Sequence, residues 1–237
     1  MPISQSPKQP ASPPRRDPSP SPQTADDCER CAQITSPPDV ANLSWQDATA
    51  PQRHELILQT ALTLLREAGP DAVTMRGIAQ RLGVGAMTLY TYVDSADNLH
   101  QLMIRRGFET LHQTCCSAGQ ANPNAANHWR GGAEAYLQFA QAHPNLYRLM
   151  FESPLPESDH DLLEAGFSGL LMHVTQRLAQ TGVQEPDLAR QARTEAGRYW
   201  LCLHGLAMAI IADRTSLLHG SIDDVLTNLL DHAAPRC

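Results

Sequence analysis

The chain has 237 residues and a mass of 26.0 kDa, which suits one medium domain or a small domain followed by a larger one. Its 25 acidic and 18 basic residues give a formal charge of −7 at pH 7. That balance excludes a polybasic coat for nucleic acid and leaves room for a local DNA-binding element. Because the sequence has neither an apolar run of about 18 residues nor a secretory signal, we expect a cytoplasmic protein without membrane contact.

The cysteines and histidines do not form a recognisable metal or cofactor site. Cys28 and Cys31 have the spacing of half a zinc site, but zinc needs four ligands and no second pair accompanies them. His173 and His204 lie on different predicted helices, where a single histidine is more simply a core residue than a ligand. We therefore expect no metal ion and no cofactor.

Residues 1–50 differ in composition from the rest of the chain. Of the 18 prolines, 11 lie between Pro2 and Pro51, mixed with Ser, Gln and Asp. Such a segment buries too little apolar surface to offset its ordering entropy, so we predict a disordered tail. Lys8, Arg15 and Arg16 would suit a mobile arm near DNA phosphates, although an inert tail is the simpler interpretation.

The sequence becomes helical in its periodicity from His54 onward. An apolar stripe from Ile57 to Ala68 predicts a helix, and the pair Gly69-Pro70 ends it. Thr74 is suited to cap a short second helix that ends at Gly83, and a third helix is predicted over 85–93. Two short helices joined by a glycine-marked turn are the layout of a helix-turn-helix motif, whose second helix enters the major groove.

The side chains of this predicted recognition helix suit contact with DNA. Small residues allow the backbone to approach base edges, threonine can contact a thymine methyl group or a phosphate, and tyrosine hydroxyls bind phosphates. An arginine at the start of the preceding helix could contact a base edge or the DNA backbone. These candidate DNA-binding residues are Arg76, Gly85, Ala86, Thr88, Tyr90, Thr91 and Tyr92.

Residues 74–84 have the sequence TMRGIAQRLGV, and residues 87–93 have the sequence MTLYTYV. Together they resemble the DNA-binding signature of the TetR family of regulators, over about residues 53–103. The resemblance implies an all-helical homodimer that binds a palindromic double-stranded DNA operator and senses a small molecule. It places Ala86, Met87 and Thr88, together with Arg76, Tyr90 and Tyr92, at positions that contact DNA. Thr74, at the start of the motif, completes the predicted set.

The chain departs from the family pattern in one respect. A lysine usually follows the recognition helix at the start of the next helix, where this sequence has Ala96 between acidic residues. Residues 51–112 contain six arginines and six acids, so this part of the chain is neutral. We therefore expect weak non-specific DNA binding with a shallow dependence on salt. Backbone N–H groups after Ser95 could still hold a phosphate.

The remaining sequence predicts more helices and no strand. They are expected near residues 95–115, 128–142, 145–151, 159–181, 186–214 and 221–234. The predicted fold is all-α. It comprises a disordered tail (1–50), a three-helix helix-turn-helix domain (51–112) and a helical-bundle domain for ligand binding and dimerisation (113–237).

Two further segments, residues 135–151 (AYLQFAQAHPNLYRLMF) and residues 200–207 (WLCLHGLA), resemble the C-terminal domain of one group of TetR-type regulators. In that group the last two helices build a four-helix dimer interface. The helices that start near Pro186 and Ser221 would supply it here, with Gly205, Ala207 and Ala209 allowing close approach across a two-fold axis.

A pocket for a small apolar effector would use the aromatic residues of the C-terminal helices with a few polar anchors. The candidates are Trp129, Tyr136, Phe139, Tyr147, Phe151, Phe167, Trp200 and His204. Each could also be an ordinary core residue. The sequence thus predicts a ligand-responsive repressor. An activator, or a helical binding protein that has lost operator contact, is the alternative. Without a Gly-rich phosphate loop or a nucleophile elbow, we do not expect an enzyme.

Overall fold

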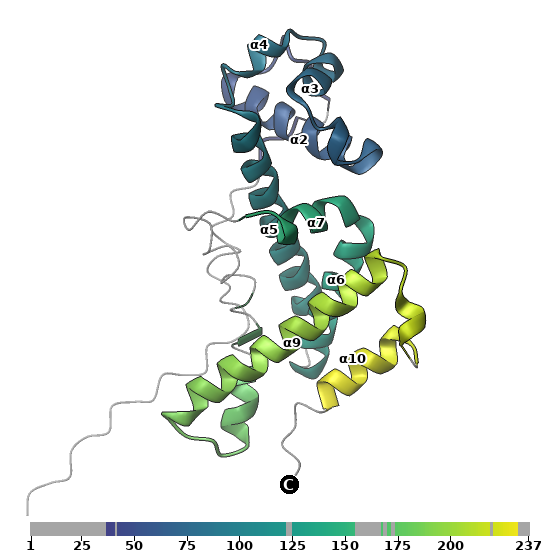
Figure 1. Cartoon of the computed structure of the whole chain (residues 1–237). Helices are drawn as coiled ribbons and strands as arrows, with labels where there is room; N and C mark the ends of the chain where they lie inside the picture. Colours follow the sequence, from purple (N-terminus) through teal and green to yellow (C-terminus); the bar gives the residue numbers. More distant parts are fainter. Residues whose placement is uncertain are drawn as a thin grey trace, which may run out of the picture.

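Figure 1 shows a computed structural model of the chain. The structure describes residues 37–40, 42–121, 125–154, 167, 170–171, 174–218 and 220–231. Expectations for the tail up to residue 36, including Cys28 and Cys31, and for His173 lie outside the described residues. Every element within them is an α-helix or a 3-10 helix, which confirms the predicted all-α fold class.

The first elements form the predicted helix-turn-helix arrangement. They are α2 (Ala50–Ala68), the 3-10 turn η1 (Pro70–Ala72), α3 (Met75–Leu82) and α4 (Ala86–Leu89). The Thr74 hydroxyl accepts a hydrogen bond from the Gly77 N–H at 3.0 Å, so the predicted cap of α3 is confirmed. Gly83 ends α3 in the left-handed conformation, at φ +70°, which glycine adopts without steric cost.

The recognition helix is shorter than the sequence predicted. Helix α4 ends at Leu89, and residues 90–92 form a turn in which the Tyr92 and Val93 N–H groups both donate to the Leu89 carbonyl. Aromatic and β-branched side chains fill positions 90–93, and these residue types favour helices weakly. The prediction of a helix over 85–93 was therefore wrong at its C-terminal end.

Helix α5 (Ala96–Gln120) connects the two ends of the molecule (Figure 1). The Ser95 hydroxyl caps it by accepting from the Asn98 N–H at 3.0 Å. It continues five residues beyond the predicted end at Cys115. Buried side chains recur along its length, from Leu99 to Leu111, and they contact first one hydrophobic core and then the next.

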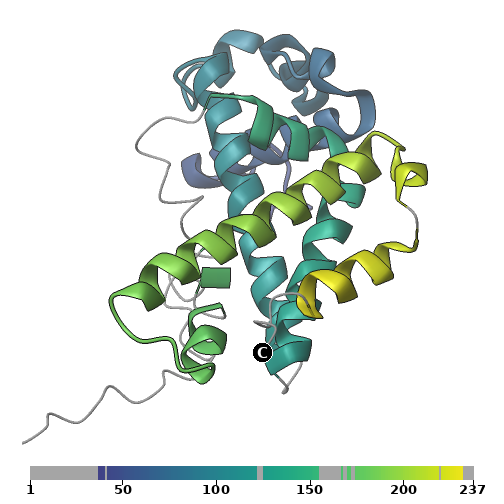
Figure 2. The same ribbon diagram turned by 60° about the horizontal axis from the view of Figure 1, so that its bottom comes forward.

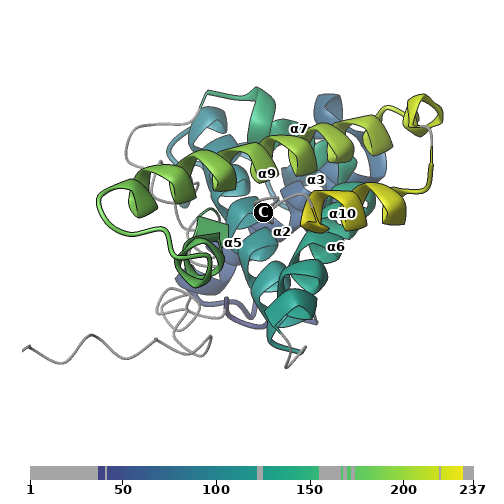
Figure 3. The same ribbon diagram turned by 90° about the horizontal axis from the view of Figure 1, so that it is seen from below.

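The C-terminal helices are α6 (Ala125–Ala142), α7 (Pro144–Glu152), α9 (Asp187–Ile211), the turn η3 (Thr215–Leu217) and α10 (Ile222–Asp231). Helix α6 packs against α5, and α9 packs mainly on α6. Figure 2 and Figure 3 show α9 as a long helix lying across this layer, with α10 following after a loop. Of the helix predicted over 159–181, the described residues include a helical stretch at 174–180.

These helices pack around two main hydrophobic cores. The N-terminal unit comprises α2, α3, α4 and the first half of α5, around the fully buried Ile57, Ile78 and Leu89. The C-terminal unit comprises the rest of α5 with α6, α7, α9 and α10. Leu146 and Leu149 of α7 pack against both cores. Among the described helices, none has the length and apolar character needed to span a bilayer.

Candidate DNA-binding surface and effector site

The predicted DNA-binding residues gather at one end of the N-terminal unit, where α3 and α4 lie (Figure 1). Leu89, the last residue of α4, is completely buried and packs the helix against the N-terminal core. On the outer side, Met87 is 79% exposed and Tyr90 is 45% exposed. An apolar side chain as exposed as Met87 is unusual for a motif that packs only against its own protein, because large apolar groups are favoured inside.

Seven of the nine predicted residues are exposed and two are half-buried. The exposed ones are Thr74, Arg76, Gly85, Met87, Thr88, Tyr90 and Thr91, and the half-buried ones are Ala86 and Tyr92. They therefore offer small, hydroxyl, cationic and aromatic side chains on adjoining segments of one surface, which is the mixture that contacts base edges and phosphates.

Tyr92 contacts the first turn of α2 and the segment that precedes it. Its hydroxyl accepts from Arg53 Nη1 at 3.0 Å, and its ring meets that of Trp45 edge-on at 5.3 Å. The Arg53 guanidinium also donates to the backbone carbonyls of Trp45 and Gln46 and lies over the Trp45 ring. Sequence reasoning missed Arg53 and Trp45. No local pattern indicates a contact between residues 39 positions apart.

Arginines of the N-terminal unit form ion pairs with acidic residues of the same chain. Arg81 pairs with Glu67 at 2.7 Å, and Arg106 donates two hydrogen bonds to Glu55, at 2.7 and 2.9 Å. Glu55 is 4% exposed. Burial acts to raise its pKa, but the hydrogen bonds and positive charge of Arg106 outweigh burial and hold the pKa below its ordinary value. These pairs leave fewer cations for phosphates, in line with the neutral charge of residues 51–112.

Five of the predicted effector residues meet between α6, α7 and α9. The Tyr136 and Tyr147 hydroxyls are 2.7 Å apart, and the Tyr147 hydroxyl is 2.8 Å from His204 Nδ1. Trp200 stacks on His204 with ring centroids 5.3 Å apart, and Phe151 lies 4.8 Å from the same imidazole. Burial raises the pKa of both tyrosines and lowers that of His204, so all three polar groups are neutral near pH 7.

The other three predicted effector residues lie elsewhere. Trp129 meets Tyr199 at 5.7 Å and packs against both the C-terminal core and a smaller third core built around Leu170 and Ala196. Phe167 packs against the third core. Phe139 faces the imidazole of His143 at 5.0 Å. Among the described residues, no group of three or more His, Cys, Asp or Glu is placed to hold a metal ion.

Two family models match the chain, one to each unit. Residues 57–101 match the model described as bacterial regulatory proteins of the tetR family, and residues 129–233 match a tetracyclin repressor-like C-terminal domain. The chain belongs to the TetR family. It is a DNA-binding transcriptional regulator, and α3 and α4 form its helix-turn-helix.

Individual relatives of this TetR-family regulator are distant in sequence. It is 28% identical over 176 residues to the uncharacterized HTH-type transcriptional regulator Rv0681 of Mycobacterium tuberculosis, spanning 73% of this chain and 74% of that one. A protein of unknown function from Rhodococcus sp. RHA1 shares the fold with a TM-score of 0.62 and 22% identity, over 80% of this chain and 95% of the other. The TetR family regulator PfmR from Thermus thermophilus gives a TM-score of 0.53 and 18% identity, over 75% of this chain and 96% of the other.

Proposed function

We propose that this TetR-family regulator is a homodimeric repressor that binds a palindromic operator and leaves it when a small apolar effector occupies the C-terminal helices. It acts in the cytoplasm and catalyses no reaction. Residues 51–112 form the DNA-binding domain, residues 113–237 bind the effector and the second protomer, and residues 1–50 are a tail. The observation that carries this proposal is the distribution of exposed large hydrophobic side chains.

Three large hydrophobic side chains are exposed in the part of the chain that the structure describes. Met87 and Tyr90 lie on the helix-turn-helix surface, and Leu201, at 61% exposed, lies on α9. The operator would cover the first two. A second protomer would cover Leu201, and the exposed Gly205 one turn further along α9 would allow close helix approach. A two-fold dimer would hold its recognition helices one DNA turn apart, about 34–36 Å, to match two half-sites.

The Tyr136–Tyr147–His204 chain supports the effector site. It supplies hydroxyl and imidazole groups within walls made by Phe151 and Trp200, which is the mixture of a few polar anchors and apolar surface that ligand sites use. An effector that hydrogen-bonds to Tyr147 would separate it from His204. The resulting change in the placement of α7 and α9 would shift the dimer toward a state that fits the operator less well.

DNA binding is tested by fluorescence anisotropy with the DNA upstream of the regulator's own coding sequence. A scrambled duplex and two salt concentrations serve as controls. We expect salt-sensitive binding with two protomers per site, and weaker binding in both Arg76→Ala and Tyr90→Phe. Arg148→Ala, an exposed arginine on α7, is the matched control. Wild-type affinity in both variants would refute the assigned residues. Failure to select any duplex from random DNA would refute operator binding altogether.

Dimerisation is tested by sedimentation of the full chain. Leu201→Glu places a charge on the proposed interface and should shift the protein toward monomer, raising the dissociation constant by about tenfold or more. Gln138→Glu adds the same charge at an exposed position on α6 and should leave the dimer unchanged. If the dimer is as stable with Leu201→Glu as with Gln138→Glu, Leu201 and its face of α9 are not part of the interface.

The neutral charge of residues 51–112 and the alanine at position 96 favour a second candidate function, a helical binding protein that has lost operator contact. It predicts equal affinity for operator and scrambled DNA in the same titration. Activation in place of repression would be recognised by an operator that lies upstream of the promoter and does not overlap it.

A further inference from the structure

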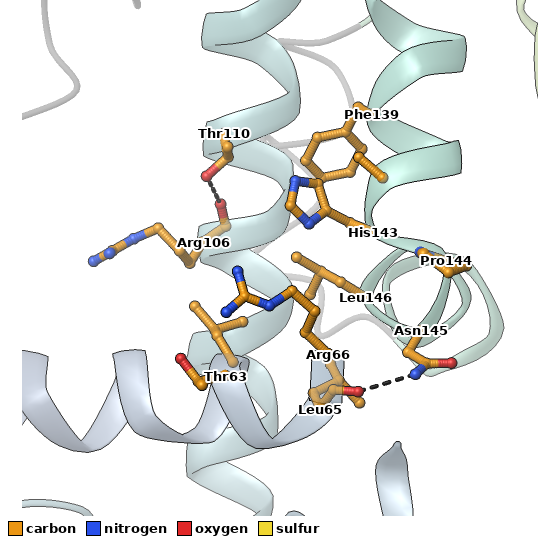
Figure 4. Close-up of a pocket in the computed structure, with 12 residues that line it drawn as sticks. Thr63, Leu65, Arg66, Arg106, Thr110, Phe139, His143, Pro144, Asn145 and Leu146 are labelled. Carbon is orange, nitrogen blue, oxygen red and sulfur yellow. Dashed lines mark hydrogen bonds between the residues drawn. The ribbon is translucent and has the colours of Figure 1, made fainter. Parts of the chain in front are cut away.

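A cavity of about 460 Å³ lies where α2, α5, α6 and α7 meet, between the N-terminal and C-terminal units (Figure 4). This volume falls within the range of about 300–1,000 Å³ that small-molecule sites occupy. Its lining includes none of Tyr136, Tyr147 and His204. The cavity is therefore separate from the proposed effector site, and we call it the junction cavity.

The junction cavity has positive charge that its own lining does not neutralise. Arg66, Arg106 and His143 contribute to the wall, and none of the described residues that line it is acidic. Arg106 is engaged by Glu55 through two hydrogen bonds. Arg66 has a much weaker contact, 3.9 Å from Glu67, whose other carboxylate oxygen accepts from Arg81 at 2.7 Å.

Arg66 and His143 converge on the same space. Figure 4 shows the Arg66 guanidinium of α2 pointing toward the imidazole of His143, across the cavity from its own helix. Burial and the nearby charge of Arg66 both lower the pKa of His143. An anion placed between the two groups would accept hydrogen bonds from both and reverse this effect on the imidazole.

The rest of the wall is largely apolar. Phe139 lies behind the His143 ring, with Leu146 nearby, and Leu62 also lines the cavity. The Thr110 hydroxyl is already satisfied, because it donates to the Arg106 carbonyl at 2.7 Å. A ligand would thus meet a guanidinium and an imidazole with apolar side chains close beside them.

We propose that the junction cavity binds a small amphipathic carboxylate, with the carboxylate between Arg66 and His143 and the apolar part against Phe139, Leu62 and Leu146. A planar carboxylate matches a guanidinium through two parallel hydrogen bonds. One weakly paired guanidinium beside a neutral imidazole suits a single negative charge better than the double charge of a phosphate. The site is independent of the proposed effector site, so either can fail without the other.

Occupancy of the junction cavity would bear directly on the contact between the two units. Asn145 of α7 donates to the Leu65 carbonyl of α2 at 2.9 Å, and both residues line the cavity (Figure 4). A ligand here touches the helix that packs under α3 and also the start of α7. If the ligand binds one arrangement of this contact more tightly than another, operator affinity changes by the ratio of those two ligand affinities.

The test is calorimetric titration of the full-length protein with octanoate, compared with octan-1-ol as an uncharged molecule of the same chain length. We expect one octanoate per protomer and binding of octan-1-ol about tenfold weaker or less. Arg66→Gln should weaken octanoate by about tenfold, the range for a lost charge-assisted hydrogen bond. Arg148→Gln, exposed on α7 outside the cavity, should not change it.

A second measurement locates the ligand. Octanoate in the junction cavity should raise the pKa of His143, because a carboxylate then faces the imidazole along with Arg66. An NMR titration follows this pKa, and His143→Gln assigns the signal. Thr63→Trp should fill the cavity and abolish binding without removing any charge. Equal octanoate affinity in Arg66→Gln, an unmoved pKa of His143, or no binding at about 1 mM octanoate would each overturn the proposal.

Discussion

Replacing Arg106 with methionine should destabilise the protein by about 3 kcal/mol, because the substitution leaves a buried carboxylate without its cationic partner. Glu55 is 4% exposed and accepts two hydrogen bonds from Arg106, at 2.7 and 2.9 Å. Loss of one partner from such a buried pair costs about 3–5 kcal/mol. Gln59 still donates to Glu55 at 3.1 Å, which places the expected cost near the lower end.

The same substitution should reverse the pH dependence that Glu55 contributes. In the wild-type protein the native pKa of Glu55 lies below its ordinary value of 4.5. The contribution of ionised Glu55 to the free energy of unfolding is therefore complete above pH 4.5 and lost as the pH falls through the native pKa. Without Arg106, burial dominates and raises the native pKa above 4.5. Stability is then greatest below the ordinary value and falls as the pH rises through the raised pKa.

Urea unfolding monitored by circular dichroism, at one protomer concentration and several pH values, measures both effects. Arg81→Met breaks the exposed pair with Glu67 and should cost less than about 1 kcal/mol. Glu55→Leu combined with Arg106→Met removes both charges and should recover most of the lost stability. If Arg106→Met costs no more than Arg81→Met, or if the double variant is as unstable as the single one, the pair does not shield a buried charge.

Three further predictions concern local packing, capping and charge. Gly107→Ala should be about 1–3 kcal/mol less stable than Gly132→Ala in thermal unfolding. A Cβ at Gly107 would lie 2.5 Å from Met150 Sδ, whereas one at Gly132 meets nothing closer than 3.5 Å. Equal stabilities would contradict the close approach of α5 and α7 at Gly107. Thr74→Ala should cost about 1 kcal/mol in urea unfolding and Thr74→Ser much less, and equal losses would exclude the hydroxyl cap. Arg76→Ala should reduce the slope of log affinity for operator against log salt by about 0.9 per protomer, and an unchanged slope would mean that Arg76 does not contact phosphate.

Features set by local sequence were predictable. The cap at Thr74 and the end of α3 at Gly83 each follow from residue type and helical period within a few positions. The C-terminal end of α4 did not follow, because its aromatic and β-branched residues favour helices weakly and the Tyr92 hydroxyl is bonded to the distant Arg53. Tertiary contact overrides the period there.

Contacts between distant segments were not predictable in detail. Tyr136, Tyr147 and His204 were chosen for residue type, and their pairing depends on how α9 crosses α6 and α7. Phe167 packs against another core, and Trp129 packs against both. Glu55 was missed although a signal was present. It lies three residues before the buried Leu58, on the inward face of α2, where an acid requires a cationic partner.

Helix α7 is the element through which a ligand in the C-terminal unit would act on the helix-turn-helix. Tyr147 belongs to the hydrogen-bonded chain with His204, and two residues earlier Asn145 donates to the Leu65 carbonyl of α2. Leu146 and Leu149 pack against both main cores. A closely packed helix of nine residues shifts as a unit, because its own hydrogen bonds resist bending. A ligand that displaces Tyr147 would therefore move Asn145 or break its bond, and either event changes how α2 supports α3.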